Sequence, residues 1–473
     1  MDKIQKNIRR VFWLYFVLFT ALALYLGKLI FFDGASLTAS VLNPRLQIEN
    51  KTLLRGDILD ADGQVLAESQ RAPDGTITRH YPLGSDGAHL VGFADYQKAG
   101  LLGVESAYNA VLQTARNELW QRLLRFFNDS EVKGSSLVLT VSGDLQQYAA
   151  QQLGQQKGAI LILEPSTGKI LAMVSYPAFD PNHVRENWDA LKSDEGGSPL
   201  LNRASQGKYP PGSVFKIITA AAALEHVPDV GAFRYTCTGV ETFDGSDLTC
   251  FNSIVHGDEE ISKAFSVSCN TFFATMGIQI GAENLRNVAE RFYFNTSIPF
   301  PLEYSVSSFP LSHSSSETEI AETAIGQGRI MATPLQMTLI TAAVANEGVM
   351  MAPYVVDHVL DYNSRTVSKT MPAMMDAVFT VEEADRLTAM MEEVMKTGTG
   401  KNAAVSGVSI AAKTGTAQTT PNEEDHGWFV AFTPVENPQY ALCVVLENGG
   451  GASRTLPIAK NIISYLQSPE KNK

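Results

Sequence analysis

Ser213 and Lys216 are the first residues that could carry chemistry. They follow residues 210–212, Pro-Pro-Gly, and precede an apolar, alanine-rich run. Proline and glycine ahead of such a run are typical of a helix start, and side chains three positions apart share one helix face. A serine hydroxyl becomes nucleophilic beside a base, and burial or a second cation lowers the pKa of a lysine enough for it to serve. The pair predicts a serine nucleophile with a lysine base; the alternative is a helix-capping serine followed by a surface lysine.

A second motif is Ser268-Cys269-Asn270, which follows a segment with helical spacing. On a short loop between helices, a hydroxyl and an amide two positions apart can both reach a cleft. Ser268 could then relay a proton between Lys216 and a leaving group, and Asn270 could hydrogen-bond a substrate amide. Taken alone, the motif is better explained as a pair of helix caps.

A third motif, Lys413-Thr414-Gly415-Thr416, ends a strand-like segment. Because alternate side chains of a strand share a face, it offers a cation and hydroxyls along one edge, with a glycine where a ligand backbone could approach closely. Such an edge suits an extended peptide that ends in a carboxylate; a solvated strand end is the alternative. Together, the order S-x-x-K, S-x-N, K-T-G matches the active-site serine penicillin-recognising enzymes.

The elements that must position these motifs are strands at both ends of one region with helices between them. The first strand is continuously apolar, which predicts a buried strand inside a sheet. The pattern predicts one sheet assembled from both ends and covered by helices, an α+β or α/β layered domain. The expected strands are 159–163, 169–174, 409–416, 427–433 and 440–447, and the last helix is 456–466.

The N-terminus predicts a membrane anchor. Residues 1–10 carry four basic residues, and residues 11–32 are almost uncharged, about the length that crosses a bilayer as a helix. The basic flank predicts residues 1–10 as a cytoplasmic tail and the remaining chain outside the membrane. A cleaved signal peptide is the alternative, with Ala21-Leu22-Ala23 as a nominal site, but the apolar run is too long for an ordinary signal.

Composition narrows the class of protein. The chain of 473 residues is 45% hydrophobic and 18% charged, which fits a folded protein of roughly two to four domains. Its net charge of −13 argues against general nucleic-acid binding, which requires a basic surface. Residues 33–140 contain no nucleophile paired with a base, so we expect a structural module there, with a hairpin around an Asp/Gly turn at residues 60–63.

Beyond the three motifs, the chain resembles the class B penicillin-binding proteins from about residue 43 to residue 448. The similarity is carried by these blocks: 55–67, 103–109, 209–216, 326–337 and 413–429. It implies the α+β fold of the serine penicillin-recognising enzymes (β-lactamase/transpeptidase-like), an antiparallel sheet with helices on both faces. It also implies a transpeptidase domain at residues 141–473, behind a small pedestal or dimerisation-type domain at residues 33–140.

The resemblance further implies a peptidoglycan D,D-transpeptidase that cross-links stem peptides through a serine acyl-enzyme and is inhibited by β-lactams. It assigns catalytic roles to Ser213, Lys216, Ser268, Asn270 and Lys413, and substrate-binding roles to Thr414, Gly415 and Thr416. Lys413 and the two threonines would dock the terminal carboxylate. The backbone N–H groups of Ser213 and Thr416 would form the oxyanion hole. No cofactor is required.

The implied partners are stem peptides ending in D-Ala-D-Ala, β-lactams, the cytoplasmic membrane and a membrane glycosyltransferase of the cell-wall machinery, with no nucleic acid. The pedestal is too small to hold a glycosyltransferase of its own. A D,D-carboxypeptidase of the same fold remains an alternative, because the active-site residues do not separate the two. A non-catalytic scaffold should have decayed motifs, a β-lactamase usually lacks a pedestal, and a β-lactam sensor needs a cytoplasmic effector domain.

Three of the four cysteines lie close together in the sequence with a histidine: Cys237, Cys250, His256 and Cys269. Three cysteines and a histidine are a recognised tetrahedral zinc set, although this spacing is not that of a common short zinc module. A Cys237–Cys250 disulfide outside the cell and free thiols are the alternatives. The sequence leaves the three open.

Overall fold

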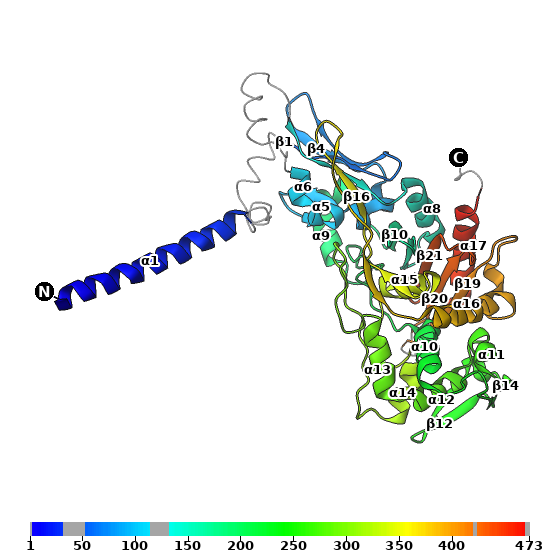
Figure 1. Cartoon of the computed structure of the whole chain (residues 1–473). Helices are drawn as coiled ribbons and strands as arrows, with labels where there is room; N and C mark the ends of the chain where they lie inside the picture. The colour runs from blue at the N-terminus through cyan, green and yellow to red at the C-terminus, as the bar shows by residue number, and fades with distance from the viewer. Residues whose placement is uncertain (1, 32–52, 114–131, 420–422, 469–473) are drawn as a thin grey trace.

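The computed structural model describes residues 2–31, 53–113, 132–419 and 423–468 (Figure 1). The predicted anchor falls on α1 (Asp2–Phe31), whose apolar side chains, Phe12 and Phe16 among them, are exposed. Its stretch Gln5–Leu26 is the one helix of the described residues that is long and apolar enough to cross a membrane. Residues 33–52, the start of the predicted pedestal, lie outside the described residues.

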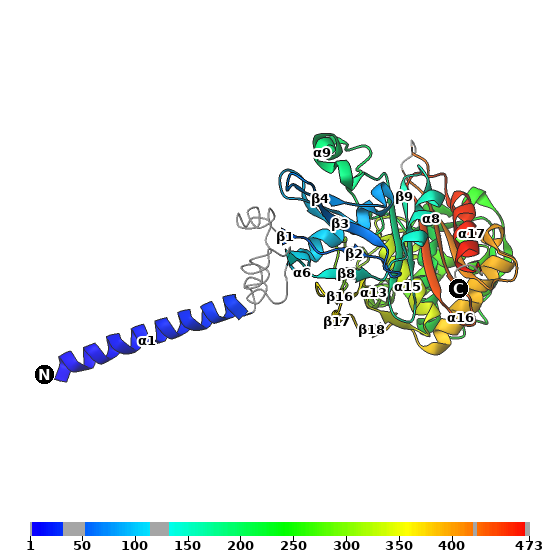
Figure 2. The same cartoon turned by 90° about the horizontal axis from the view of Figure 1, so that it is seen from above.

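A six-stranded sheet in the order β17-β16-β8-β2-β3-β4 follows the anchor in sequence (Figure 2). Its strands are β2 (Ile58–Leu59), β3 (Val65–Arg71), β4 (Ile77–His80), β8 (Ser136–Leu139), β16 (Val356–Leu360) and β17 (Thr366–Lys369). The predicted hairpin around residues 60–63 is the antiparallel pair β2–β3. Strands β16 and β17 come from residues 356–369, within the predicted transpeptidase domain, so that domain contributes one edge of this sheet.

Short elements complete the described part of the pedestal region. They are β1 (Leu53–Leu54), α4 (Ala88–Val91), β5 (Phe93–Asp95), β6 (Gly100–Leu102), α5 (Gly103–Ala107), α6 (Asn109–Gln113) and β7 (Val132–Lys133). Two of the sequence blocks meet here, because Arg55 and Arg79 both donate to the carboxylate of Glu105, at 2.5 and 2.7 Å. All three side chains are almost completely buried, so these blocks build the interior of the pedestal.

The second sheet has five antiparallel strands in the order β10-β9-β21-β20-β19. They are β9 (Gly158–Leu163), β10 (Ile170–Tyr176), β19 (Ala411–Ala417), β20 (His426–Thr433) and β21 (Tyr440–Leu446). Strand β9 pairs with β10 on one side and with β21 on the other, so the two ends of the sheet-forming region meet in one sheet. The predicted assembly from both ends is confirmed, and the sheet is the antiparallel one that the resemblance implied.

Both faces of the five-stranded sheet are buried. Along β9, Leu161 and Leu163 belong to one hydrophobic cluster, whereas Ile160 and Ile162 belong to another on the opposite face. This alternation explains why the strand is apolar throughout. Helices α8 (Gly143–Leu153) and α17 (Thr455–Leu466) cover the second face, while α15 (Pro334–Ala345) packs on the first.

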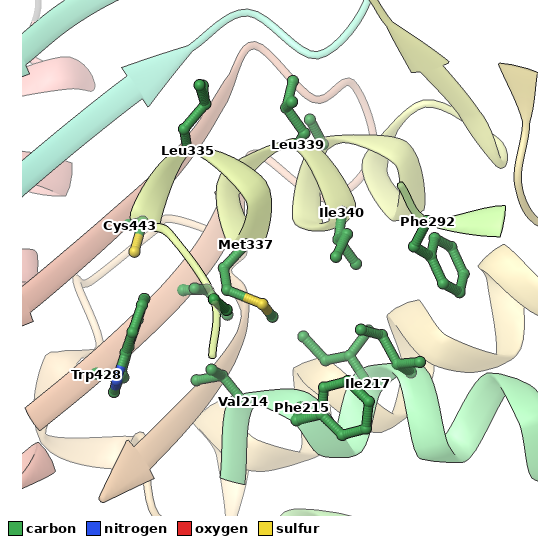
Figure 3. Packing of buried hydrophobic residues seen from close by; sticks show 14 of the residues in the cluster. Val214, Phe215, Ile217, Phe292, Leu335, Met337, Leu339, Ile340, Trp428 and Cys443 are labelled. Atoms are coloured by element: carbon green, nitrogen blue, oxygen red, sulfur yellow. The ribbon is translucent and has the colours of Figure 1, made fainter. Parts of the chain in front are cut away.

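Helix α15 joins the sheet to the segment that carries Ser213. Figure 3 shows Met337 and Ile340 of α15 directed toward Phe215 and Ile217, with Trp428 of β20 beside Val214. All of these side chains are fully buried. The serine segment therefore rests on a close-packed layer, which limits its movement relative to the sheet.

The remaining elements lie between β10 and β19. They are α9 (Val184–Ser193), η3 (Gly212–Phe215), α10 (Lys216–His226), β11 (Tyr235–Cys237), β12 (Val240–Phe243), β13 (Ser246–Thr249), η4 (Phe251–Ser253), β14 (Gly257–Glu259), α11 (Ile261–Ser266), α12 (Asn270–Ile280), α13 (Ala282–Arg291), α14 (Glu317–Ala324), β15 (Val349–Met351), β18 (Met374–Ala377) and α16 (Val381–Lys396). Helix α10 packs against α11, α12, α13 and α16, and these contacts bury its first turns.

Candidate active site

Ser213 lies in the short 3₁₀ turn η3, which leads directly into α10. It lines a cleft of about 900 Å³ together with Ser268, Asn270, Thr414 and Thr416. The structure thus brings residues of all three motifs to one cavity. The predicted helix start is confirmed, with the serine in the tighter turn that precedes the α-helix.

The position of Ser213 is set by the residue before it. Gly212 has a φ of +54°, and a Cβ there would lie 2.5 Å from the carbonyl oxygen of Thr416. Its backbone N–H donates to the Gly326 carbonyl at 2.8 Å, and the Trp428 indole donates to the Pro210 carbonyl at 3.0 Å. Three of the sequence blocks therefore meet at this turn, where only glycine allows the backbones to approach so closely.

Lys216 reaches the second motif from a fully buried position. Its Nζ donates to Asn270 Oδ1 at 2.7 Å, to the Ser268 carbonyl at 2.8 Å and to Ser268 Oγ at 3.3 Å. Burial lowers the pKa of the Lys216 ammonium to about 8, which makes the neutral amine accessible near physiological pH. Among the described residues, the hydrogen bonds of Lys216 Nζ go to Ser268 and Asn270 and not to Ser213, and catalytic hydrogen bonds often tighten only when substrate binds.

Lys413 approaches Ser268 from β19. Its Nζ donates to Ser268 Oγ at 3.0 Å and to the Thr414 carbonyl at 3.0 Å. Burial, and then the positive charge of Lys216, hold the pKa of Lys413 well below its usual range. Because Lys413 is fully buried and does not line the cleft, its charge would act on a bound carboxylate from beneath the surface.

Ser268 lies on the predicted loop between two helices, α11 and α12. Its φ of +62° is uncommon for a residue other than glycine. Backbone strain of this kind costs about 1–3 kcal/mol and persists where surrounding structure enforces it. Here the Cys269 N–H donates to the Ala264 carbonyl at 2.8 Å, and Cys269 also caps α12. The loop is thus held with Ser268 between the two lysines.

The third motif lies on β19, the strand at the edge of the five-stranded sheet. Thr416 lines the cleft, and its hydroxyl accepts a hydrogen bond from the Ala452 N–H at 3.2 Å. Gly415 does not line the cleft. A Cβ there would lie 3.0–3.1 Å from Val214 and from the Pro211 carbonyl, so this glycine lets the serine turn pack against β19, and its role in substrate binding stays a prediction.

Two further cleft residues were not found by the sequence analysis. Thr399, in the loop after α16, has its hydroxyl 2.5 Å from that of Thr414. Gln327, between two glycines of the 326–337 block, also lines the cleft. Thr399 has no local signal in the sequence, whereas Gln327 lies in a block that the resemblance marks and could have been found there.

The cysteine-rich segment lies beside this cleft. The ligand atoms of Cys237, Cys250, His256 and Cys269 all lie within 4.8 Å of one another, and the chain's cysteines are free. Cys269 connects this cluster to the second motif, since it stands between Ser268 and Asn270.

Comparison with known proteins agrees with this geometry. A family model described as the penicillin binding protein transpeptidase domain matches residues 158–464, and one described as the penicillin binding protein A dimerisation domain matches residues 55–137. The chain is 34% identical to the peptidoglycan D,D-transpeptidase PbpA of Mycolicibacterium smegmatis, over 92% of this chain and 93% of that protein.

Solved structures give the same result. The D,D-transpeptidase domain of a peptidoglycan glycosyltransferase from Eggerthella lenta superposes with a TM-score of 0.80 and 31% identity, over 88% of this chain and 99% of that chain. Penicillin-binding protein A from M. tuberculosis, solved as a penicillin G acyl-enzyme complex, has a TM-score of 0.81 and 32% identity, over 88% of this chain and all of that chain. The resemblance inferred from the motifs is confirmed: the chain belongs to the class B penicillin-binding proteins, which are peptidoglycan D,D-transpeptidases.

Proposed function

We propose that Ser213 forms the acyl-enzyme through which this transpeptidase cross-links stem peptides. The Ser213 oxygen attacks the carbonyl of the penultimate D-Ala, the terminal D-Ala leaves as the amine, and an amine of a neighbouring stem then takes the acyl group. The observation that carries this assignment is that Ser213 and Ser268 line one cleft, with the buried Lys216 donating to Ser268 Oγ. A β-lactam would acylate the same oxygen and block the cycle.

Lys216 is the general base in this proposal. In its neutral form it accepts the proton of Ser213 as the serine attacks, and its lowered pKa makes that form available. The proton then passes by way of the Ser268 hydroxyl to the leaving amine, because Ser268 Oγ lies within reach of Lys216 Nζ. Asn270 accepts from Lys216 through its side-chain oxygen and donates to the Thr249 carbonyl at 3.0 Å, and the second hydrogen of its amide would bind the substrate.

Lys413 influences the proton relay through its charge. Two buried lysines that share one hydroxyl repel each other, which favours a pair carrying a single positive charge. Thr414 and Thr416 would bind the terminal carboxylate at the cleft surface, with the Lys413 charge below them. The backbone N–H groups of Ser213 and Thr416 would stabilise the oxyanion, an arrangement whose loss typically costs about 10²–10³ in rate.

The organisation of the chain supports action at a membrane surface. We assign residues 1–10 to the cytoplasm, residues 11–32 to a single membrane span, residues 33–140 to the pedestal and residues 141–473 to the transpeptidase domain outside the membrane. The long apolar helix and the basic residues at its N-terminal end support this orientation. The exposed position of the pedestal suits contact with a membrane glycosyltransferase that supplies the glycan strands.

A cross-linking assay tests the proposal and separates it from the carboxypeptidase alternative. The full chain in detergent is incubated with donor peptides ending in D-Ala-D-Ala and with an acceptor amine of the stem type. We expect cross-linked dimers from the wild type and none from Ser213→Ala. Release of D-Ala with hydrolysed monomer as the dominant product would instead indicate a D,D-carboxypeptidase.

A further inference from the structure

The cysteine–histidine cluster has the geometry of a tetrahedral metal site. Cys250 Sγ lies 3.7 Å from Cys237 Sγ and 3.7 Å from Cys269 Sγ, and Cys237 Sγ lies 3.4 Å from His256 Nδ1. Zinc–sulfur bonds of about 2.3 Å place the sulfurs of a tetrahedral site about 3.8 Å apart, and a shorter zinc–nitrogen bond brings the imidazole slightly closer. These three separations match the edges of such a site, and the other three pairs of ligand atoms lie within 4.8 Å.

The surroundings of the four residues are those of ligands. The Thr271 hydroxyl, itself fully buried, lies 3.3 Å from Cys237 Sγ, 3.4 Å from Cys269 Sγ and 3.6 Å from Cys250 Sγ. The Phe272 backbone N–H points at Cys269 Sγ from 3.4 Å. Donors that converge on sulfur atoms stabilise thiolates, the form in which cysteine binds a metal.

A buried carboxyl group lies beside the cluster. Glu259 ends β14 beside the Cys269 thiol and is 1% exposed. Within the described part of the chain, neither of its carboxylate oxygens has a hydrogen-bond partner. The carboxyl group therefore borders the cluster at Cys269, where metal ligands commonly have a polar neighbour.

The segment that contributes the first three ligands has very little core of its own. Residues 235–259 form two separate two-stranded sheets, β11–β14 and β12–β13, outside the two main sheets. Besides Glu259, the buried side chains of this segment are Cys237, Phe243 and Cys250. Two small sheets with so few buried apolar groups need another source of stability, and a structural metal is a common one in small folding units.

We propose that Cys237, Cys250, His256 and Cys269 bind one zinc ion, which fastens residues 235–259 to the loop of the second motif. Three thiolates and an imidazole select zinc over magnesium or calcium, which prefer oxygen ligands, and a closed four-ligand set indicates a structural site. Binding releases the protons of the three thiols to solvent. A Cys237–Cys250 disulfide would not explain the placement of His256 and Cys269 around the same point.

The zinc would also position catalytic groups, a consequence that rests on the proposed function. Cys269 is bonded along the chain to Ser268 and Asn270, and the Ser268 backbone is in a strained conformation. Anchoring the Cys269 sulfur therefore fixes the two side chains that contact Lys216. The four ligands do not touch the reacting atoms, so their role is one of positioning.

Metal analysis of the full chain, purified in detergent without chelators, tests the site directly. We expect about one zinc per chain by mass spectrometry of the metal, as a closed structural site requires. We also expect thiolate-to-cobalt charge-transfer absorption when cobalt replaces zinc. Folded protein that contains no zinc and takes up neither metal, or a non-reduced peptide map with a Cys237–Cys250 disulfide, would overturn the proposal.

Variants identify the ligands. His256→Ala and Cys237→Ser should lose the metal and the cobalt absorption, whereas Cys443→Ala should keep both, because Cys443 is a buried cysteine of β21 outside the cluster. Zinc retained by both ligand variants would contradict the assignment. If a variant does not fold, the metal content and cobalt spectrum of the wild type still decide the question.

Acylation by a fluorescent penicillin tests the positioning role. Zinc-depleted wild type and His256→Ala should react about 10–100-fold more slowly than the zinc-loaded wild type, since small displacements of catalytic groups cost rates of this order. An unchanged rate after zinc loss would overturn the positioning role. Absence of acylation in the zinc-loaded wild type would count against the proposed function and leave the metal site standing.

Discussion

Lys413 Nζ donates a hydrogen bond to Ser268 Oγ across 3.0 Å, although the two residues are 145 positions apart in the chain. The same hydroxyl lies 3.3 Å from Lys216 Nζ. Ser268 therefore connects the lysine beside the nucleophile with the lysine of the edge strand. This shared hydroxyl couples the three motifs, and the predictions for catalysis start from it.

Replacing Lys216 should remove the base without removing the nucleophile. We expect Lys216→Ala to lower the second-order rate constant of benzylpenicillin acylation by about 10²–10⁴-fold, with Lys216→Arg similarly slow because arginine stays protonated. Stopped-flow or gel-based labelling with a fluorescent penicillin measures the rate. Lys208→Ala, which alters an exposed lysine near the same turn, should react like the wild type. A Lys216→Arg variant with wild-type rates would show that another group is the base.

The acylation rate should depend on pH through Lys216. Burial lowers its pKa to about 8, and only the neutral amine can accept the serine proton. The rate constant should therefore rise roughly tenfold per pH unit below about 8 and level off above it. The measurement is the acylation rate between pH 6 and pH 9.5 on folded protein. A flat profile, or one that falls as the pH rises, would contradict the assignment of Lys216 as base.

Removing the shared hydroxyl should interrupt the proton path. Ser268→Ala should slow acylation by about 10²-fold or more, while thermal unfolding of the full chain stays close to that of the wild type. Ser266→Ala is the matched control, because it removes a buried hydroxyl of α11 that donates to the Lys263 carbonyl. Equal rates for the two variants would assign Ser268 a purely structural role.

The ion cluster of the pedestal should contribute to stability and not to catalysis. Glu105→Gln leaves Arg55 and Arg79 buried without a negative partner, which should lower the free energy of unfolding by about 3–5 kcal/mol. Urea-induced unfolding measures this loss, and the folded fraction should still be acylated at the wild-type rate.

The comparison for this variant is an exposed ion pair. Asp189→Asn removes the charge that faces Lys98, where the two side chains are 84% and 39% exposed, and should cost at most about 1 kcal/mol. If Glu105→Gln were as mild as Asp189→Asn, the buried cluster would not hold the pedestal together.

Much of the fold could be predicted because its sheet is built from locally recognisable strands. The continuous apolar run of β9 predicted a buried strand, and Leu161 and Ile162 do face opposite hydrophobic clusters. The Pro-Pro-Gly sequence before Ser213 predicted the helix start. Local propensity and periodicity were sufficient for these elements.

The rest depended on contacts between distant parts of the chain. Pairing of β16 with β8 joins residues more than two hundred positions apart, and no local pattern in Val356–Leu360 reveals its partner. Thr399 acquires its place only when α16 packs on β19. The packing of Val214 against Gly415 was likewise not predictable, because the sequence does not say which backbone approaches a glycine.

Intact-protein mass spectrometry after incubation with benzylpenicillin tests the central claim most directly. The full chain, wild type and Ser213→Ala, is treated under identical conditions, and digestion then locates the modified peptide. We predict one covalently bound penicillin on Ser213 of the wild type and none on the variant. A folded wild type without an adduct, or an adduct that persists in Ser213→Ala, would contradict the assignment of Ser213 as the acylated residue.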